Sequence, residues 1–355
     1  MENSINKSLA RPLDAFFPGK TLCLAQQLTQ GLINTTYKVA FIETNTAYIL
    51  QRVNNTVFND LEGIMQNIEQ YQNATDQQPT LSLAFLKTTS GNYYFKDEKQ
   101  DYWRTCTFVA NSMAYNNAPN TTVAKEAGIL IGSFLKNTHK IDLSQTKITL
   151  PNFHSLSRRI NEFRHALQQS SAKRNEKSSQ ARSIIEAYAE TLLTLEKSNL
   201  PLRFCHNDSK LNNLLFDAKT NKGVCMIDLD TLMPGFFFYD FGDAIRTVCN
   251  TAPENEKKLA SIGFNEAYFR AFLAGFKPYA GLLTTEEKNS LATGCCYMPF
   301  IHGVRALADY LNNDRYYLVT YPDENLDRAM SLLTFAKITA NHLPKLNQMV
   351  KEYLN

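Results

Sequence analysis

The residues best suited to chemistry stand in a short polar segment in the second half of the chain. Asp208 and Asn213 lie five positions apart, and Asp228 stands fifteen positions beyond Asn213. Two short apolar runs between these polar groups, at 214–217 and 224–227, predict a β-hairpin. Because both polar ends of such a hairpin meet at one edge, the spacing predicts a cluster of oxygen-bearing side chains.

That cluster would contain three carboxylates and one amide, from Asp208, Asn213, Asp228 and Asp230. Carboxylates placed so close together repel one another unless a cation lies among them. Oxygen ligands of this kind suit Mg²⁺, which keeps several waters and also binds phosphate oxygens. The spacing therefore predicts a magnesium site. Asp230 is assigned to the substrate, with a second Mg²⁺ as the alternative.

The segment resembles the catalytic core of the kinase-like phosphotransferases, which include aminoglycoside phosphotransferases, choline kinases and N-acetylhexosamine kinases. A lone His-x-Asp would more often be an ordinary hydrogen-bonded loop, but Asn213 and Asp228 at their spacings favour the kinase interpretation. In protein kinases a loop Asp accepts the substrate hydroxyl proton, while an Asn and a later Asp hold Mg²⁺. The resemblance implies that Asp208 is the base, that Asn213 and Asp228 bind metal, and that His206 orients the loop.

Two further stretches resemble the N-acetylhexosamine 1-kinases in particular. They are Asp-Leu-Asp-Thr-Leu-Met-Pro-Gly at 228–235 and Tyr-Asp-Phe-Gly-Asp-Ala-Ile-Arg at 239–246. Asp228 already provides the metal ligand after its strand, so we expect Asp240 and Asp243 to brace the catalytic loop or cap a helix. The resemblance implies transfer of the γ-phosphate of ATP to the anomeric hydroxyl of an N-acetylhexosamine, giving a sugar 1-phosphate.

Other acceptors remain open within the same class, namely another sugar, a choline-like amino alcohol or an aminoglycoside. An aminoglycoside site should be rich in acidic groups, which the region 285–320 is not. The rival from another class is a catalytically silent nucleotide-binding scaffold. Such scaffolds usually lose the base or a metal ligand, whereas Asp208, Asn213 and Asp228 are all present.

On the nucleotide side, the resemblance places a phosphate-covering loop at 30–37, with Gly31, Asn34 and Thr35 as candidate ligands. This loop has a single glycine, so it departs from the pattern G-x-G-x-x-G, and alone it could be a plain hairpin turn. The next strand should supply a cation for the α- and β-phosphates. Arg52 is the candidate, and the strand's register decides whether Arg52 or Gln51 faces the nucleotide.

The end of the first lobe would meet the adenine base. The resemblance places a hinge at 109–111, where the backbone of Val109 and Asn111 would contact adenine. On the acceptor side, Arg305 and Asp309 lie four positions apart and so share one helix face. They are either a surface ion pair or ligands of sugar hydroxyls, and the resemblance to an N-acetylhexosamine kinase signature favours ligands.

The elements that must position these residues follow from the hydrophobic spacing. The first hundred residues predict strands around one helix at 57–73, and helical spacing begins near residue 123. The resemblance implies an α+β, bilobal, protein-kinase-like fold with a small N-terminal antiparallel sheet lobe and a larger helical C-terminal lobe. The first, nucleotide-binding lobe would span 1–111, and the catalytic and acceptor-binding lobe 112–355. Strands are predicted at 21–53, 92–96 and 102–110, and helices at 123–138, 155–169, 178–197, 254–275, 285–311 and 324–352, with a mobile surface connection at 168–180.

The composition excludes several classes of protein. The 355 residues include 37 basic and 34 acidic side chains, and a net charge of +3 is too small for a nucleic-acid-binding surface. The seven cysteines are scattered without a Cys-x-x-Cys pair, so we expect reduced thiols and a cytoplasmic protein. No apolar stretch approaches membrane-spanning length, and the first 20 residues lack a signal-peptide core. We therefore expect ATP and Mg²⁺ as cofactors, a small-molecule acceptor, and neither nucleic acid nor membrane as a partner.

Overall fold

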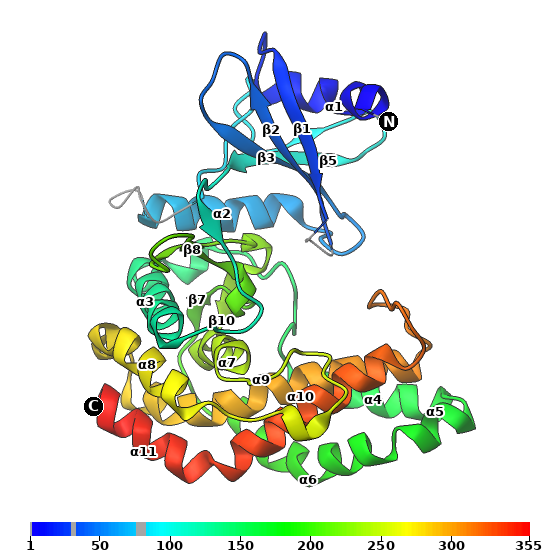
Figure 1. Cartoon of the computed structure of the whole chain (residues 1–355), viewed down its shortest axis with the longest axis vertical. Helices are drawn as coiled ribbons and strands as arrows, with labels where there is room; N and C mark the ends of the chain where they lie inside the picture. The colour runs from blue at the N-terminus through cyan, green and yellow to red at the C-terminus, as the bar shows by residue number, and fades with distance from the viewer. Residues whose placement is uncertain (1, 30–32, 76–82) are drawn as a thin grey trace.

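The protein consists of a small lobe built on a β-sheet and a larger lobe made mostly of helices (Figure 1). The computed structural model describes residues 2–29, 33–75 and 83–355. Gly31, one of the candidate phosphate ligands, lies outside these described residues. None of the helices in the described ranges is long and apolar enough to cross a bilayer.

The sheet of the small lobe is antiparallel, and its strands follow the order β1-β2-β3-β5-β4. A helix covers each face. Helix α1 (Glu2–Phe16) packs Leu9 and Leu13 against Val39 and Trp103, while α2 (Leu61–Thr75) lies against the opposite face. The strands are β1 (Leu22–Leu28), β2 (Thr35–Phe41), β3 (Ala47–Val53), β4 (Phe95–Lys96) and β5 (Tyr102–Thr107).

The large lobe contains nine α-helices among the described residues and several short strands. The helices are α3 (Thr121–Thr138), α4 (Leu156–Gln169), α5 (Ala172–Lys177), α6 (Ser179–Glu196), α7 (Phe237–Val248), α8 (Glu266–Phe276), α9 (Thr285–Leu311), α10 (Glu324–Asn341) and α11 (Leu343–Leu354). The strands are β6 (Ser112–Met113), β7 (Arg203–Cys205), β8 (Leu214–Asp217), β9 (Gly223–Met226) and β10 (Met233–Gly235). Single 3-10 turns lie at Leu143–Gln145, Leu211–Asn213, Leu229–Thr231 and Leu259–Ser261, with a longer one at Lys277–Leu282.

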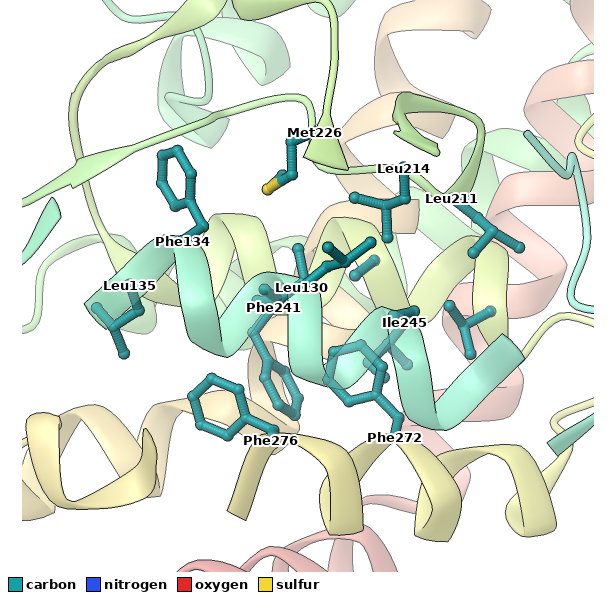
Figure 2. Packing of buried hydrophobic residues seen from close by; sticks show 14 of the residues in the cluster. Leu130, Phe134, Leu135, Leu211, Leu214, Met226, Phe241, Ile245, Phe272 and Phe276 are labelled. Atoms are coloured by element: carbon teal, nitrogen blue, oxygen red, sulfur yellow. The ribbon is translucent and has the colours of Figure 1, made fainter. Parts of the chain in front are cut away.

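The main hydrophobic core joins this helical body to the predicted catalytic hairpin. Figure 2 shows α3 in the middle of that core, with side chains of α8 on one side and of the hairpin on the other. The hairpin is therefore fixed through apolar packing on a rigid helix, as a site that needs accurate geometry requires. The labelled side chains come from α3 (Leu130, Phe134, Leu135), α7 (Phe241, Ile245), α8 (Phe272, Phe276) and the hairpin region (Leu211, Leu214, Met226).

Most predicted elements are present, and four expectations were wrong or incomplete. The amphipathic helix α1 was not predicted, since it contains Pro12. The expected helix at 254–275 begins only at Glu266, because the preceding segment is held as a loop by a β-bridge between Asn250 and Phe264. The expected helix at 324–352 is two helices, α10 and α11, and Pro344 stands in the first turn of the second.

The fourth difference concerns the connection at 168–180, which was expected to be a mobile surface segment. It contains the short helix α5, whose N-terminus is capped by the Ser171 side chain accepting from the Arg174 backbone N–H. Ser178 then ends α5 and begins α6. The Ser171 cap thus gives this polar segment regular structure, although no residue of α5 is buried.

Helices α3 and α8 cross at two glycines, and this contact predicts a measurable stability effect. A Cβ atom on Gly128 would lie 2.1 Å from the Phe272 carbonyl oxygen. We expect Gly128→Ala to lower the free energy of unfolding by about 1–3 kcal/mol, because the helices must separate to admit the methyl group. Urea denaturation measures this change. Gly281→Ala, where a Cβ meets nothing within 4 Å, is the control and should leave stability nearly unchanged.

Candidate active site

The hairpin formed by β8 and β9 brings the predicted catalytic residues together. Leu214 pairs with Met226 in an antiparallel register, so Asn213 and Asp228 flank the same end of the hairpin. The Ile227 backbone N–H donates to the Asn213 carbonyl at 2.9 Å, which closes this end. The alternation of apolar runs and polar ends in the sequence predicts this convergence.

Asp208 is held as a carboxylate by two donors. Its Oδ2 accepts from the Asn213 side-chain amide at 2.8 Å and from Lys210 Nζ at 2.9 Å. Burial opposes ionisation of Asp208, but the Lys210 ammonium outweighs it and holds the pKa of Asp208 below its usual value. Burial likewise opposes the charge of Lys210, yet Asp208 and then Asp228 raise the pKa of Lys210 above its usual value. Both groups of this pair are therefore charged at neutral pH.

Lys210 was missed by the sequence analysis, although its position was informative. It stands two residues after Asp208, and its ammonium lies 2.9 Å from the Asp208 carboxylate. A lysine this close to a candidate base both orients the carboxylate and supplies positive charge where phosphate would approach. The signal in the sequence was the single basic residue within a short loop of otherwise neutral and acidic side chains.

The backbone of the catalytic loop is fixed by the side chain of Asp240. The two carboxylate oxygens of Asp240 accept from the backbone N–H groups of His206 at 2.8 Å and Asn207 at 2.7 Å. His206 Nε2 donates to the Ile227 carbonyl at 3.0 Å, which ties the loop to β9. Burial raises the pKa of Asp240 to about 6 even though these N–H groups favour its charged form. The expectation that Asp240 braces the loop is confirmed, and both of its oxygens are occupied by the protein.

Asp243, which was expected to share that bracing role, has different partners. Its carboxylate accepts from Arg246 Nε at 2.6 Å and lies 3.4 Å from His302 Nε2. Burial opposes the charge of Asp243, but Arg246 and His302 outweigh it and hold the pKa of Asp243 far below its usual value. Asp243 is thus the centre of a buried charge cluster behind the catalytic loop.

Asp228 is placed to bind a cation. Its backbone lies in the left-handed region, with φ at 61°, and its carboxylate accepts no hydrogen bond from the described residues. Removal from bulk water and then the neighbouring Asp230 and Asp208 carboxylates raise the pKa of Asp228 to about 7. Asn213 donates its amide N–H groups to Asp208 and keeps its amide oxygen without a donor among the described residues.

These two oxygens fit a hard cation that also binds phosphate. Within the described ranges, no three side chains of the types His, Cys, Asp and Glu gather as a metal site. The protein would thus supply only Asp228 and Asn213, and phosphates and water would supply the remaining ligands, which is how Mg²⁺ is usually held. Metal binding by Asp228 and Asn213 stays a prediction.

Asp230 lies near Asp228, but its side chain is bound within the protein, which argues against its assignment to the substrate. Its carboxylate is 1% exposed and forms an ion pair with Arg104 of β5. The Asn34 side-chain amide donates to its other oxygen at 2.8 Å. Both oxygens have partners within the described residues, so Asp230 links the two lobes.

Two of the candidate phosphate ligands also have other partners. Asn34 uses both ends of its amide, because its oxygen accepts from the Asn54 backbone N–H at 2.9 Å. Arg52, the candidate cation for the α- and β-phosphates, is exposed and pairs with Asp101 at 3.3 Å. Arg52 Nη2 also lies 3.4 Å from the Thr35 hydroxyl. The register that the sequence left open therefore turns Gln51 toward the site, and the assignment of Arg52 is corrected.

The hinge residues lie where the small lobe passes into the large one. The Val109 carbonyl accepts from the Ser112 hydroxyl at 2.7 Å, and the Asn111 carbonyl accepts from the Ala218 backbone N–H at 2.8 Å. Asn111 has a positive φ of 54°. The segment is thus fixed against β8, while the contact of Val109 and Asn111 with adenine stays a prediction.

On the acceptor side, Asp309 supports a loop and does not face a ligand. Its carboxylate accepts from three consecutive backbone N–H groups, of Arg315, Tyr316 and Tyr317, at 2.9–3.0 Å. The Asn325 side-chain amide donates to it as well, at 3.0 Å. The assignment of Asp309 to sugar hydroxyls is therefore corrected: the residue fixes the loop 312–323.

Arg305 is the acceptor-side candidate that keeps free donors. Its guanidinium lies against the ring of Phe153 at 5.3 Å and that of Tyr316 at 6.0 Å, and it makes no hydrogen bond with the described residues. Burial opposes its charge, but Tyr317, Tyr316 and Asp208 nearby raise the pKa of Arg305 above its usual value. Arg305 therefore presents a charged hydrogen-bond donor on the side of the site where Asp208 lies.

A model of a known family matches the chain over residues 25–282, and its description is Phosphotransferase enzyme family. That range covers more than half of the 355 residues and includes Asp208, Asn213 and Asp228. The chain belongs to this family. The resemblance to kinase-like phosphotransferases is thus confirmed, while family membership does not distinguish one acceptor from another.

One curated relative of the phosphotransferase chain is an uncharacterized kinase-like protein from Caenorhabditis elegans. The two are 25% identical over 172 residues. The matched region covers 48% of this chain and 38% of the length of the relative.

Solved structures confirm the kinase-like bilobal fold of this phosphotransferase. A microcompartment-associated aminopropanol kinase superposes with a TM-score of 0.63 at 14% identity, covering 97% of this chain and 98% of its own. A spectinomycin phosphotransferase bound to ADP and spectinomycin gives 0.64 at 14% identity, covering 94% and 98%. An amicoumacin kinase bound to AMP-PNP, Ca²⁺ and Ami gives 0.60 at 13% identity, covering 99% and 94%.

The geometry of Asp208 predicts the effect of removing its charge. Asp208→Asn keeps the side-chain shape but cannot accept a proton, so we expect turnover to fall at least about a hundredfold. AMP-PNP binding, measured by calorimetry, should persist. Asp217→Asn, at the opposite end of the same hairpin, is the control and should retain full turnover. Near-normal turnover in Asp208→Asn would show that another group aligns the acceptor.

The raised pKa of Asp228 predicts that Mg²⁺ competes with a proton for this carboxylate. Because the pKa of Asp228 is about 7, its protonated form predominates at lower pH and must lose a proton before it binds metal. The Mg²⁺ concentration for half-maximal turnover should therefore rise as the pH falls from about 8 to about 6, by up to about tenfold per pH unit below the pKa. Initial rates at several Mg²⁺ concentrations test this.

The matched variants for the metal site are Asp228→Ala and Asp240→Ala. Asp228→Ala should abolish the Mg²⁺ response. Asp240→Ala should weaken turnover through the loop but keep the response, because both Asp240 oxygens are bound to backbone N–H groups. If Asp228→Ala keeps the Mg²⁺ response and Asp240→Ala loses it, the metal ligand is Asp240 and the assignment of Asp228 is wrong.

Proposed function

We propose that this phosphotransferase uses ATP and Mg²⁺ to phosphorylate a hydroxyl of a small acceptor, and that the acceptor is an N-acetylhexosamine attacked through its anomeric oxygen. The observation that carries the proposal is the arrangement of Asp208, Lys210 and Asn213 beside Asp228. A charged carboxylate, an ammonium and two metal-compatible oxygens at one hairpin end are the parts that phosphoryl transfer to a hydroxyl requires.

In the proposed mechanism, each side chain has a distinct task. Asp208 accepts the hydrogen bond of the attacking hydroxyl and takes its proton on a carboxylate oxygen as the phosphoryl group is transferred. Lys210 keeps Asp208 ionised and adds positive charge near the transferred group. Bound Mg²⁺, held by Asn213 and Asp228, would neutralise charge on the phosphates. Most of the rate gain then comes from positioning and charge stabilisation.

On the nucleotide side, we propose that ATP lies under the sheet of the small lobe. Val109 and Asn111 would contact adenine at the hinge, and the hairpin that contains Thr35 would cover the phosphates. The lobe boundary would fall between 111 and 112, where β6 begins the pairing with β8. The proposed cytoplasmic location is supported by the cysteines: all are free, and Cys23 alone is exposed.

The charges on the acceptor side support a neutral acceptor over a cationic one. The nearby carboxylates already have partners within the described residues: Asp309 binds loop N–H groups, and Glu162 pairs with Arg158 at 2.8 Å and Arg159 at 2.7 Å. Arg305 has free donors. An aminoglycoside or amino alcohol needs free carboxylates for its ammonium groups. A sugar that carries a neutral acetamido group instead offers hydroxyl and carbonyl oxygens to a guanidinium.

A panel of acceptors tests the proposed function directly. ATP consumption should be measured with N-acetylhexosamines, other sugars, choline-like amino alcohols and aminoglycosides. Phosphorylation of the anomeric oxygen removes the reducing end, so the product with a hexosamine should fail a reducing-sugar assay. A product that still reduces, or turnover only with amines, would assign the enzyme to another acceptor class. ATP binding without turnover on any acceptor would favour the silent scaffold.

The free guanidinium of Arg305 predicts a selective effect on the acceptor. Hydrogen bonds to a charged group contribute about 1.5–3 kcal/mol, so Arg305→Ala should raise the acceptor KM about ten- to a hundredfold and leave the ATP KM nearly unchanged. Steady-state kinetics with each substrate varied in turn measures both constants. Arg270→Ala, on the exposed side of α8, is the matched control and should change neither.

A variant of Asp309 distinguishes direct contact with the acceptor from support of the loop 312–323. Asp309→Asn should also raise the acceptor KM, but together with faster proteolysis of 312–323, since that loop loses its carboxylate anchor.

Equal rises in the acceptor and ATP KM after Arg305→Ala would contradict the assignment of Arg305.

A further inference from the structure

Strand β3 presents no basic side chain on the face of the sheet that would meet the nucleotide. Gln51 of β3 points toward the interface between the lobes, while Arg52 points away to Asp101. Across the β3–β5 ladder, Gln51 lies directly opposite Arg104. Directly opposed residues project to the same face of a sheet, so the basic side chain on this face comes from β5.

Arg104 is buried and enclosed by partners from both lobes. Its side chain is 2% exposed, and it forms an ion pair with Asp230 of the large lobe. Within the small lobe, Arg104 donates twice to Gln51 Oε1, at 3.0 and 2.9 Å, and its guanidinium lies 5.2 Å from the ring of Phe85. A guanidinium so enclosed cannot reach a nucleotide in this arrangement, and its charge is directed at Asp230.

Asp230 belongs to the same turn as Asp228, the proposed metal ligand. The turn Leu229–Thr231 is fixed to the catalytic loop as well, because the Thr231 hydroxyl donates to the His206 carbonyl at 2.7 Å and the Asn207 amide donates to the Thr231 carbonyl at 3.1 Å. Asp228 itself has a positive φ, a backbone conformation that Asp adopts more readily than most residues other than glycine. The turn is thus held by the catalytic loop within the large lobe and by Arg104 of the small lobe.

We infer that Arg104 is a positioning residue, which ties the metal-binding turn to the nucleotide-binding sheet so that Asp228 meets a metal ion carried by the phosphates. This inference rests on the proposed function, in which Asp228 is a metal ligand. Residues that orient a metal ligand commonly change metal affinity about ten- to a hundredfold when removed. Arg104 would act indirectly, through Asp230 and the backbone of the turn, without touching the metal ligand.

The test measures nucleotide binding rather than turnover. Calorimetry gives the dissociation constant of AMP-PNP with and without Mg²⁺, and the ratio of the two constants is the Mg²⁺ gain. Arg104→Gln should leave binding without Mg²⁺ within about twofold and reduce the Mg²⁺ gain about tenfold or more. Arg104→Lys, which keeps the charge but loses the paired guanidinium geometry, should show an intermediate gain.

Loss of stability must be separated from loss of positioning. Removing one partner of a buried ion pair is strongly destabilising, whereas replacing both by apolar residues of similar volume is often tolerated. The double variant Arg104→Met/Asp230→Leu should therefore fold, as near-ultraviolet circular dichroism can show, and still lack the Mg²⁺ gain. Arg203→Gln, which breaks an ion pair with Glu287 inside the large lobe, is the matched control and should keep the gain.

The variants distinguish failure of the inference about Arg104 from failure of the proposed metal site at Asp228. The inference is overturned if Asp228→Asn loses the Mg²⁺ gain while the folded double variant keeps it, because the turn would then need no link to the sheet. If Asp228→Asn keeps the full gain, the proposed metal site itself is wrong, and the inference falls with it. If Arg203→Gln loses the gain as well, the effect reflects general destabilisation, which also overturns the inference.

Discussion

Compensation of buried negative charge is the constraint on which this site depends. Aspartates gather around the end of one hairpin, and carboxylates so close together cannot all ionise without cations among them. The structure gives three of them a basic partner: Asp208 with Lys210, Asp243 with Arg246, and Asp230 with Arg104. Asp228 has no ion pair with the described residues, and its pKa is raised to about 7. Asp228 thus stands without a basic partner at the place where a metal–phosphate complex would supply the missing charge.

The catalytic hairpin could be predicted because its information is local. Asp208, Asn213 and Asp228 are separated by short strands, and strand pairing alone brings their polar ends together. Most helices and strands followed from hydrophobic spacing for the same reason, whereas the antiparallel sheet lobe followed from the resemblance to kinase-like phosphotransferases. Helix α1 was missed because a proline inside it interrupts the spacing, although its apolar face covers the sheet.

Residues whose partners come from distant segments could not be predicted. Asp230 looked like a ligand because it stands two positions from Asp228, but its partner Arg104 lies on another strand in the other lobe. The choice between Gln51 and Arg52 depended on which face of β3 turns toward the site. Apolar and polar residues do not alternate strictly along β3, so its sequence does not reveal the inward face. Asp309 shares a helix face with Arg305, yet its hydrogen bonds go to a loop that the sequence left without structure.

The loop 312–323 has a consequence for how acceptor preference can change during evolution. Three consecutive backbone N–H groups converge on the Asp309 carboxylate, and Arg174 and Lys177 of α5 pair with Asp314 and Asp323 near the two ends of the loop. The backbone path is thus set by groups that do not depend on the outward side chains. Tyr316 and Leu318 are 56% and 81% exposed. If the acceptor binds beside Arg305 as proposed, substitutions at such positions would alter the surface offered to it at little cost in folding, without any change to the catalytic hairpin.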